Sequence, residues 1–185
     1  VYKVANYDIN CWADNAHGAL SLRKAVEKSC NPSFIQLGQR IGTDRFYKYL
    51  QAFGLLQKTG VRMSGEANSI FVSKDNCHEV ELATMSFGQR FKITPLQLVA
   101  AISACVNGGD LMQPRIVSKV VNTDTGVETE LAPVKVRQVI SESTSSKIKS
   151  MMESVVTTGT GKYAAVNGYS VGGKSGTSEP DPNKP

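Results

Sequence analysis

The sequence lacks the closely spaced cysteines and histidines that protein metal sites usually show. None of its four cysteines forms a Cys-x-x-Cys pair, and its two histidines are far apart. These residues are Cys11, Cys30, Cys77, Cys105, His17 and His78. Because zinc ligands normally recur at short spacing, the sequence predicts no bound metal, and we expect no cofactor.

Long apolar runs are also missing. No stretch approaches the roughly 20 apolar residues that a membrane-spanning helix requires. The chain opens Val1-Tyr2-Lys3-Val4, without a basic start followed by an apolar segment, so it shows no signal peptide. It also lacks an initiating methionine, and we expect it to be trimmed at both ends.

The positive charge is not arranged for nucleic acid. The 21 Lys and Arg exceed the 16 Asp and Glu, which gives a net charge of +5, but the basic residues are scattered. Aromatic residues, only 7% of the chain, are not interleaved with the densest basic cluster at 147–149, as a nucleic-acid platform would require. The charge therefore indicates a solvated surface, and we expect no nucleic-acid partner.

What is present fits one globular α+β domain. The 185 residues and the 41% apolar fraction are typical of a single soluble domain. Apolar spacing and capping signals predict a loop-like start, a series of helices, an irregular stretch, a hairpin and a last strand. The loop runs to about residue 19, the helices cover 22–28, 32–41, 44–53, 95–106 and 143–156, the irregular stretch covers 55–92, the hairpin joins 116–121 to 127–131, and the strand covers 169–177. Ser21 and Thr94 are the expected N-caps, and Gln97 completes a capping box with Thr94. The expected apolar face of the helix at 95–106 comprises Leu96, Val99, Ala100 and Val106. This order suggests an antiparallel sheet with helices packed on it.

Two short motifs contain residues that can carry chemistry. Ser29-Cys30-Asn31 lies at a break between two expected helices, and Lys174-Ser175-Gly176-Thr177 lies on the expected last strand. Each motif alone is weak, because Ser29 and Asn31 can simply cap helices and Lys174 can be a surface charge.

Together the motifs suit acyl transfer from a peptide that ends in a carboxylate. That reaction needs a nucleophile, a base, a proton donor for the leaving amine, oxyanion donors and a cation for the carboxylate. Ser29 can relay a proton, Asn31 can orient both the substrate amide and the neighbouring lysine, and Lys174 can supply the cation. The Ser175 and Thr177 hydroxyls lie beside Lys174 in sequence, Gly176 lets substrate backbone approach, and the Thr177 N–H can point at the oxyanion. This is the arrangement of penicillin-recognising enzymes.

The whole chain resembles the class B penicillin-binding proteins. Besides the two motifs, a set of short landmarks occurs in that family's order. They are His17-Gly18, Phe53-Gly54, Thr59-Gly60, Gly65-Glu66, Gly88-Gln89, Thr94-Pro95-Leu96-Gln97-Leu98, Asn107-Gly108-Gly109 and Gly159-Thr160-Gly161. The resemblance implies the transpeptidase fold and a serine D,D-transpeptidase that cross-links peptidoglycan stem peptides and is acylated by β-lactams. It also implies an extracytoplasmic domain of a membrane-anchored protein, with the anchor outside this chain, and a partner glycosyltransferase.

The family's nucleophile, the serine of a Ser-x-x-Lys motif upstream of Ser-x-Asn, has no counterpart here. Ser21-Leu22-Arg23-Lys24 begins only eight residues before Ser29, and its serine is better explained as a helix cap. Ser146-Lys147-Ile148-Lys149 comes after the Ser-x-Asn motif. We therefore expect residues 1–185 to be a fragment of one transpeptidase domain, without the Ser-x-x-Lys segment and the strands that follow Thr177, and inactive alone.

Cys11 and Cys30 are 19 residues apart, on segments that lead into the Ser-x-Asn motif. Their pairing resembles sporulation-type members of the family, and an extracytoplasmic domain can hold a disulfide. The alternative is two unpaired small side chains.

Two other functions remain open from the sequence. A β-lactamase or β-lactam sensor shares the fold and the Lys-Ser-Gly motif, although the 94–98 string and the long 55–92 excursion favour a transpeptidase. A non-catalytic scaffold module of the same fold is the second alternative.

Overall fold

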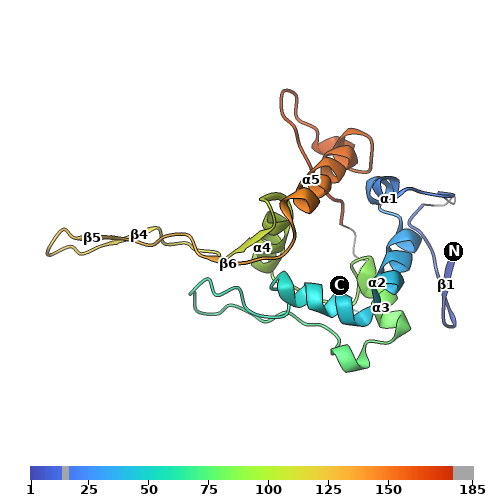
Figure 1. Cartoon of the computed structure of the whole chain (residues 1–185), viewed down its shortest axis with the longest axis horizontal. Helices are drawn as coiled ribbons and strands as arrows, with labels where there is room; N and C mark the ends of the chain where they lie inside the picture. The colour runs from blue at the N-terminus through green and yellow to red at the C-terminus, as the bar shows by residue number, and fades with distance from the viewer. Residues whose placement is uncertain (14–16, 177–185) are drawn as a thin grey trace, which may run out of the picture. The chain divides into compact units, whose positions relative to one another are not determined.

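The computed structural model describes residues 1–13 and 17–176, and these have the expected α+β composition (Figure 1). The chain divides into two units. The first comprises Val1–Lys48, Phe71–Phe91 and Lys147–Pro185, and the second comprises Tyr49–Ile70 and Lys92–Ser146. None of the helices in the described ranges combines the length and the apolar character that crossing a bilayer requires. Both chemical motifs belong to the first unit.

The first unit begins with a hairpin, where the sequence predicted a loop. Strand β1 (Tyr2–Val4) pairs antiparallel with β2 (Tyr7–Ile9). Val4 is fully buried against Ile35 and Ala83, which form the core of this unit. The prediction was wrong because strands of three residues are too short to show a clear alternation of apolar and polar residues.

Helix α1 (Leu22–Lys28) confirms the predicted range and cap. The Ser21 side chain accepts a hydrogen bond from the Lys24 backbone N–H at 3.3 Å, which satisfies one of the free N–H groups of the first turn. The helix ends at Ser29, which has left-handed backbone angles.

Helix α2 (Asn31–Ala52) contains a sharp break at Gly42, where φ is 74° and ψ is 160°. The break separates the two predicted helices, 32–41 and 44–53. Glycine tolerates this positive φ because it has no Cβ, so the prediction of two helices divided at Gly42 is confirmed.

Helix α3 (Glu79–Ser86), preceded by the 3₁₀ turn η1 (Lys74–Asn76), lies in the stretch predicted to be irregular. The many Gly, Ser and Asn residues of 55–92 concealed this eight-residue helix. A Cβ on Gly38 of α2 would lie 1.8 Å from the Ser86 Oγ. The missing side chain at Gly38 therefore lets α2 pack closely on α3.

The second unit contains α4 (Pro95–Val106), which has the predicted capping box. The Gln97 N–H donates to Thr94 Oγ1 at 3.1 Å, and the Thr94 N–H donates to Gln97 Oε1 at 2.9 Å. The predicted apolar face was partly wrong, because Val99 is 60% exposed and the buried positions include Ala101 and Ala104.

Two antiparallel pairs complete the second unit. Strand β3 (Asp110–Met112) pairs with β6 (Lys135–Gln138), and β4 (Lys119–Val121) pairs with β5 (Glu128–Glu130) in the hairpin that the sequence predicted. The hairpin extends away from α4 as a narrow arm (Figure 1). The described strands thus form three two-stranded sheets in place of the one sheet expected.

The last helix, α5 (Glu142–Thr157), confirms the predicted helix at 143–156 and is followed by the 3₁₀ turn η2 (Lys162–Ala164). The predicted strand at 169–177 is not formed over 169–176, and Thr177 lies outside the described residues. The backbone of this segment bonds to α5 and not to a strand. The Gly173 N–H donates to the Met152 carbonyl at 3.1 Å.

Candidate active site

Ser29 lies at the turn between α1 and α2, in an unusual backbone conformation. Its φ of 50° and ψ of 46° are left-handed, which costs an L-residue about 1–2 kcal/mol. The Ser29 N–H donates to the Val26 carbonyl, and the Cys30 N–H donates to the Ala25 carbonyl. These bonds end α1, reverse the chain and leave the Ser29 hydroxyl half-exposed at the turn.

Lys174 brings the second motif to this turn. Its Nζ donates to the Ser29 Oγ at 2.6 Å, although the two residues are 145 positions apart. The same Nζ contacts the Ser175 carbonyl oxygen and hydroxyl at 3.1 and 3.3 Å and lies 5.9 Å from the centre of the Phe34 ring. Partial loss of solvent around the ammonium lowers the pKa of Lys174. A lysine with a lowered pKa exchanges a proton with a neighbouring hydroxyl more readily.

Asn31 is the first residue of α2. Its side-chain Nδ2 donates to the Asn10 carbonyl at 3.4 Å, so it ties the segment before Cys11 to the start of the helix. The structure therefore places Asn31 beside the motif turn, with its amide directed to backbone and not to Lys174.

The other residues of the Lys-Ser-Gly-Thr motif are described up to Gly176. The Ser175 hydroxyl lies 3.0 Å from the Thr160 hydroxyl. A Cβ added to Gly176 would meet no atom within 4 Å, so this position is open, as the approach of a substrate backbone would require. Thr177, whose N–H was predicted to face the oxyanion, lies outside the described residues.

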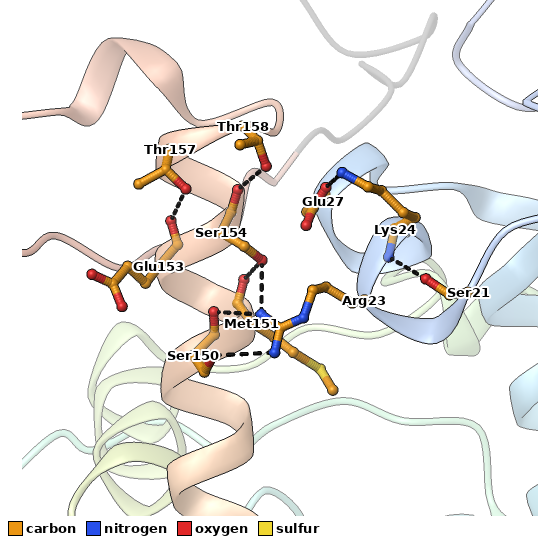
Figure 2. A network of polar contacts seen from close by, with 10 residues as sticks. All are labelled: Ser21, Arg23, Lys24, Glu27, Ser150, Met151, Glu153, Ser154, Thr157 and Thr158. Carbon is orange, nitrogen blue, oxygen red and sulfur yellow. Dashed lines mark hydrogen bonds and ion pairs between the residues drawn. The ribbon is translucent and has the colours of Figure 1, made fainter.

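Polar contacts join α1 to α5 (Figure 2), and these two helices form the frame that holds the two motifs together. The Arg23 Nη1 donates to the Ser150 carbonyl at 2.9 Å and more weakly to the Ser154 hydroxyl at 3.4 Å, while Nη2 donates to the Ser150 hydroxyl at 3.1 Å. Arginine presents several donors in a fixed fork, so one side chain fixes α1 against a full turn of α5. Sequence reasoning missed Arg23. The only sequence feature that points to its role is a row of serines one helical turn apart on α5, at positions 146, 150 and 154.

The Gly159-Thr160-Gly161 landmark connects the frame to the motifs. The Thr160 N–H donates to the Glu27 carbonyl at 3.0 Å. A Cβ on Gly159 would lie only 2.6 Å from that same carbonyl oxygen, so glycine is required for α5 to end this close to α1. The landmark thus positions Thr160 against Ser175.

Glu27 is a buried carboxylate inside this frame, and it makes the frame sensitive to acid. It is 2% exposed, and Lys24 Nζ lies 2.6 Å from its Oε2. The hydrogen bond from Lys24 lowers the pKa of Glu27 most, with further lowering by Ser154 and Thr158, while burial raises it.

The lowered pKa of Glu27 predicts a loss of stability in acid. A carboxyl whose pKa is lower in the folded state stabilises the fold above its unfolded pKa of about 4.3, and this contribution disappears as pH falls through the folded pKa. We expect wild type to be more stable than Glu27→Gln at neutral pH, with a difference that shrinks below about pH 4. Denaturant unfolding at several pH values measures this.

The control for this pH series is Glu130→Gln, which removes an exposed glutamate from β5. Its stability should follow that of wild type at every pH. A constant difference between wild type and Glu27→Gln across the series would contradict the role assigned to the Glu27 charge.

Cys11, His17 and Cys30 lie together next to the Ser29 turn. The Cys11 Sγ is 3.6 Å from the His17 Nδ1, and the potential ligand atoms of all three residues lie within 4.8 Å of one another. Cys30 is buried and the other two are half-exposed. Both cysteines are free thiols in this structure, as are Cys77 and Cys105.

The two Ser-x-x-Lys strings have other roles in the structure. The Ser21 hydroxyl caps α1, and the Lys24 ammonium pairs with Glu27. Ser146 is exposed on α5. Neither string therefore presents its serine beside its own lysine as an activated nucleophile.

Comparisons with known proteins identify the family of the chain. A model of the penicillin-binding protein transpeptidase domain matches residues 1–185. Stage V sporulation protein D of Bacillus subtilis (strain 168) is 43% identical over 172 residues, which are 92% of this chain and 27% of that protein. Penicillin-binding protein PbpB of Mycolicibacterium smegmatis is 36% identical over 159 residues, which are 82% of this chain and 24% of that protein.

Solved structures show the same fold. The D,D-transpeptidase domain of a peptidoglycan glycosyltransferase from Eggerthella lenta has a TM-score of 0.86 at 27% identity, covering 97% of this chain and 47% of its own. Penicillin-binding protein 3 from Mycobacterium tuberculosis, in complex with ampicillin, has a TM-score of 0.80 at 30% identity, covering 87% of this chain and 37% of its own. The chain thus spans about a quarter of the curated relatives named here. It belongs to the transpeptidase domain family of the class B penicillin-binding proteins.

Proposed function

We propose that this chain forms part of the acyl-transfer site of a serine-type peptidoglycan D,D-transpeptidase. The observation that carries the proposal is the 2.6 Å contact between Lys174 Nζ and Ser29 Oγ. It joins the Ser-x-Asn and Lys-Ser-Gly motifs into one polar site. The relatives named as D,D-transpeptidases support the same reaction.

The proposed chemistry assigns one task to each residue. A serine outside these 185 residues gives its proton to the lysine of its own Ser-x-x-Lys motif and attacks the carbonyl of the penultimate D-alanine, and the bond to the terminal D-alanine breaks. Ser29 passes the proton to the leaving amine, Asn31 orients the substrate amide, and the Lys174 ammonium attracts the terminal carboxylate. The Ser175 hydroxyl and the Gly176 backbone face the substrate backbone, and the Thr177 N–H donates to the oxyanion. An acceptor amine then attacks the acyl-enzyme, releases the serine and forms the cross-link.

The proposed substrates are peptidoglycan stem peptides, and β-lactams are the proposed inhibitors. The ampicillin complex of a protein 30% identical to this chain supports the second proposal. We further propose that the domain works on the outer face of the bacterial cell membrane, in a protein anchored by another segment and assisted by a glycosyltransferase. No cofactor is needed for this chemistry, because the serine, the lysine and the backbone N–H groups supply every step.

We also propose that Cys11 and Cys30 can form a disulfide that affects the site. Their sulfur atoms lie within 4.8 Å of each other, against about 2.04 Å in a disulfide. Cys30 lies between Ser29 and Asn31, so any movement of its backbone is transmitted to both. A bridge at this position therefore changes the geometry of the motif turn.

The alternatives are a β-lactamase or β-lactam sensor and a non-catalytic scaffold. Acylation by a fluorescent penicillin, followed by mass spectrometry, distinguishes them. We expect the intact protein to be labelled at a serine outside these 185 residues and to stay labelled, and we expect the isolated chain to remain unlabelled.

Each other outcome of the labelling experiment contradicts a particular part of the proposal. Labelling at Ser21, Ser29 or Ser146 would place the nucleophile inside this chain. Rapid release of hydrolysed drug would identify a β-lactamase, and an unlabelled intact protein would favour a scaffold.

A further inference from the structure

The cluster of Cys11, His17 and Cys30 has a composition and geometry that go beyond the acyl-transfer site. Three different segments contribute to it. Cys11 follows strand β2, His17 lies in the stretch before α1, and Cys30 lies at the turn between α1 and α2. Their ligand atoms lie within 4.8 Å of one another. Such a grouping of two sulfurs and one imidazole nitrogen is the donor set of several soft-metal sites.

The distances suit a tetrahedral ion. With metal–sulfur and metal–nitrogen bonds of about 2.3 and 2.0–2.1 Å, tetrahedral angles place a sulfur and a nitrogen ligand about 3.6 Å apart and two sulfurs about 3.8 Å apart. The distance from Cys11 Sγ to His17 Nδ1 is 3.6 Å. The third ligand atom, Cys30 Sγ, lies within the 4.8 Å limit of both, so a rotation of its side chain completes the three-ligand set.

The surroundings of the cluster give it a defined shape and one open side. Cys30 is buried, while Cys11 and His17 are half-exposed. Neighbouring contacts already order these segments. The Trp12 indole N–H donates to the Lys28 carbonyl at 2.8 Å, and the Trp12 and His17 ring centres are 6.0 Å apart. Water can therefore reach the exposed side and occupy a fourth coordination position.

We propose that Cys11, His17 and Cys30, in the reduced protein, bind one zinc-like divalent cation with three protein ligands and an open fourth position. The two thiols lose their protons to become thiolate ligands, and the imidazole coordinates through Nδ1. This site does not depend on the proposed transpeptidase activity. A bound ion fixes the segment at Cys11 to the turn that carries Ser29, and it uses the same sulfurs that a disulfide would consume.

The test is a titration of the reduced 185-residue chain with Co²⁺, followed by competition with Zn²⁺ and a chelating indicator. Co²⁺ bound to thiolates in a tetrahedral site gives thiolate-to-metal absorption in the near ultraviolet and strong visible bands. We expect one equivalent to bind with this spectrum and Zn²⁺ to displace it. Absence of the thiolate-to-metal absorption in the wild-type chain would overturn the proposal.

Single variants locate the ion. Substitution of a residue that supports a metal ligand typically costs 10–100-fold in metal affinity. Because Cys11 and His17 are proposed as ligands themselves, Cys11→Ser and His17→Ala are each expected to weaken binding by about a hundredfold or more. Cys105→Ser, which alters a half-buried thiol of α4, is the matched control and should bind as wild type does. Unchanged binding in both Cys11→Ser and His17→Ala would show that the ion lies elsewhere and would overturn the site.

Protection of thiols gives a second readout that does not depend on how a variant folds. In the wild-type chain, Zn²⁺ should slow alkylation of Cys11 and Cys30, measured by mass spectrometry, while alkylation of Cys105 should not change. Equal alkylation rates with and without Zn²⁺ at Cys11, the half-exposed thiol, would contradict the proposal. Failure of the proposed transpeptidase activity would leave both readouts unaffected, so the two proposals can be rejected separately.

Discussion

Lys174→Ala is expected to reduce acylation of the intact protein by a fluorescent penicillin by orders of magnitude. The ammonium donates to the Ser29 hydroxyl at 2.6 Å and to the Ser175 carbonyl at 3.1 Å. Charge-assisted hydrogen bonds of this kind are roughly twice as strong as neutral ones. Alanine removes the cation that we propose for the substrate carboxylate and also the link between the two motifs. The second-order rate constant of acylation measures the effect.

The loss should be confined to activity. Lys174 lies at the end of the described chain and is exposed over much of its surface, so the melting temperature should change little. Lys149→Ala, which removes an exposed lysine of α5, is the matched control and should acylate normally. If Lys174→Ala acylated within about threefold of wild type, a change below about 1 kcal/mol, the assigned role would be wrong.

Local signals in the sequence predicted the helices that begin with a strong cap. Ser21 and Thr94 were both identified as N-caps, and both side chains accept the expected backbone hydrogen bond. The break at Gly42 was predicted because glycine commonly ends helices, and the positive φ found there suits a residue without a Cβ. Such features depend only on neighbours within a few residues, so a single sequence contains them.

Features that depend on distant residues could not be predicted in the same way. The three-residue strands β1 and β2 form because Val4 packs on Ile35 and Ala83, and no local pattern reveals that contact. Over 169–176 the expected last strand is not formed, and the Gly173 N–H in this segment donates to the Met152 carbonyl of α5.

The residues of the candidate site could be predicted from local motifs, but the contacts between them could not. Ser29, Asn31 and Lys174 were recognised as motif residues, but the bond between Ser29 and Lys174 joins positions 145 apart. The frame residue Arg23 belongs to no motif, and it acts only because α1 lies beside α5 (Figure 2). The grouping of His17 with Cys11 and Cys30 was also not predicted, because residues outside a Cys-x-x-Cys pattern can still meet in the fold.

Oxidation of Cys11 and Cys30 is expected to slow acylation of the intact protein, by up to about a hundredfold. The sulfurs must move closer than their present separation, which is within 4.8 Å, and Cys30 shares its turn with Ser29 and Asn31. A displacement of about 1 Å in a reacting group can cost roughly 10²-fold in rate. The Asn31 side chain, which bonds to the Asn10 carbonyl beside Cys11, should shift with the same movement. Acylation rates of oxidised and reduced protein, with the disulfide mapped by mass spectrometry, measure the effect.

Variants separate the disulfide from the proposed metal site, because the two share both cysteines but only the metal site needs His17. With a chelator present throughout, Cys11→Ala should abolish the difference between oxidised and reduced protein, since no bridge can form. His17→Ala should retain that difference while losing metal binding, and Cys77→Ala, which alters a buried thiol away from the cluster, should behave as wild type. Equal acylation rates before and after complete oxidation would show that Ser29 and Asn31 keep their positions when the bridge forms. The turn between α1 and α2 would then be rigid enough to isolate the site from its cysteine.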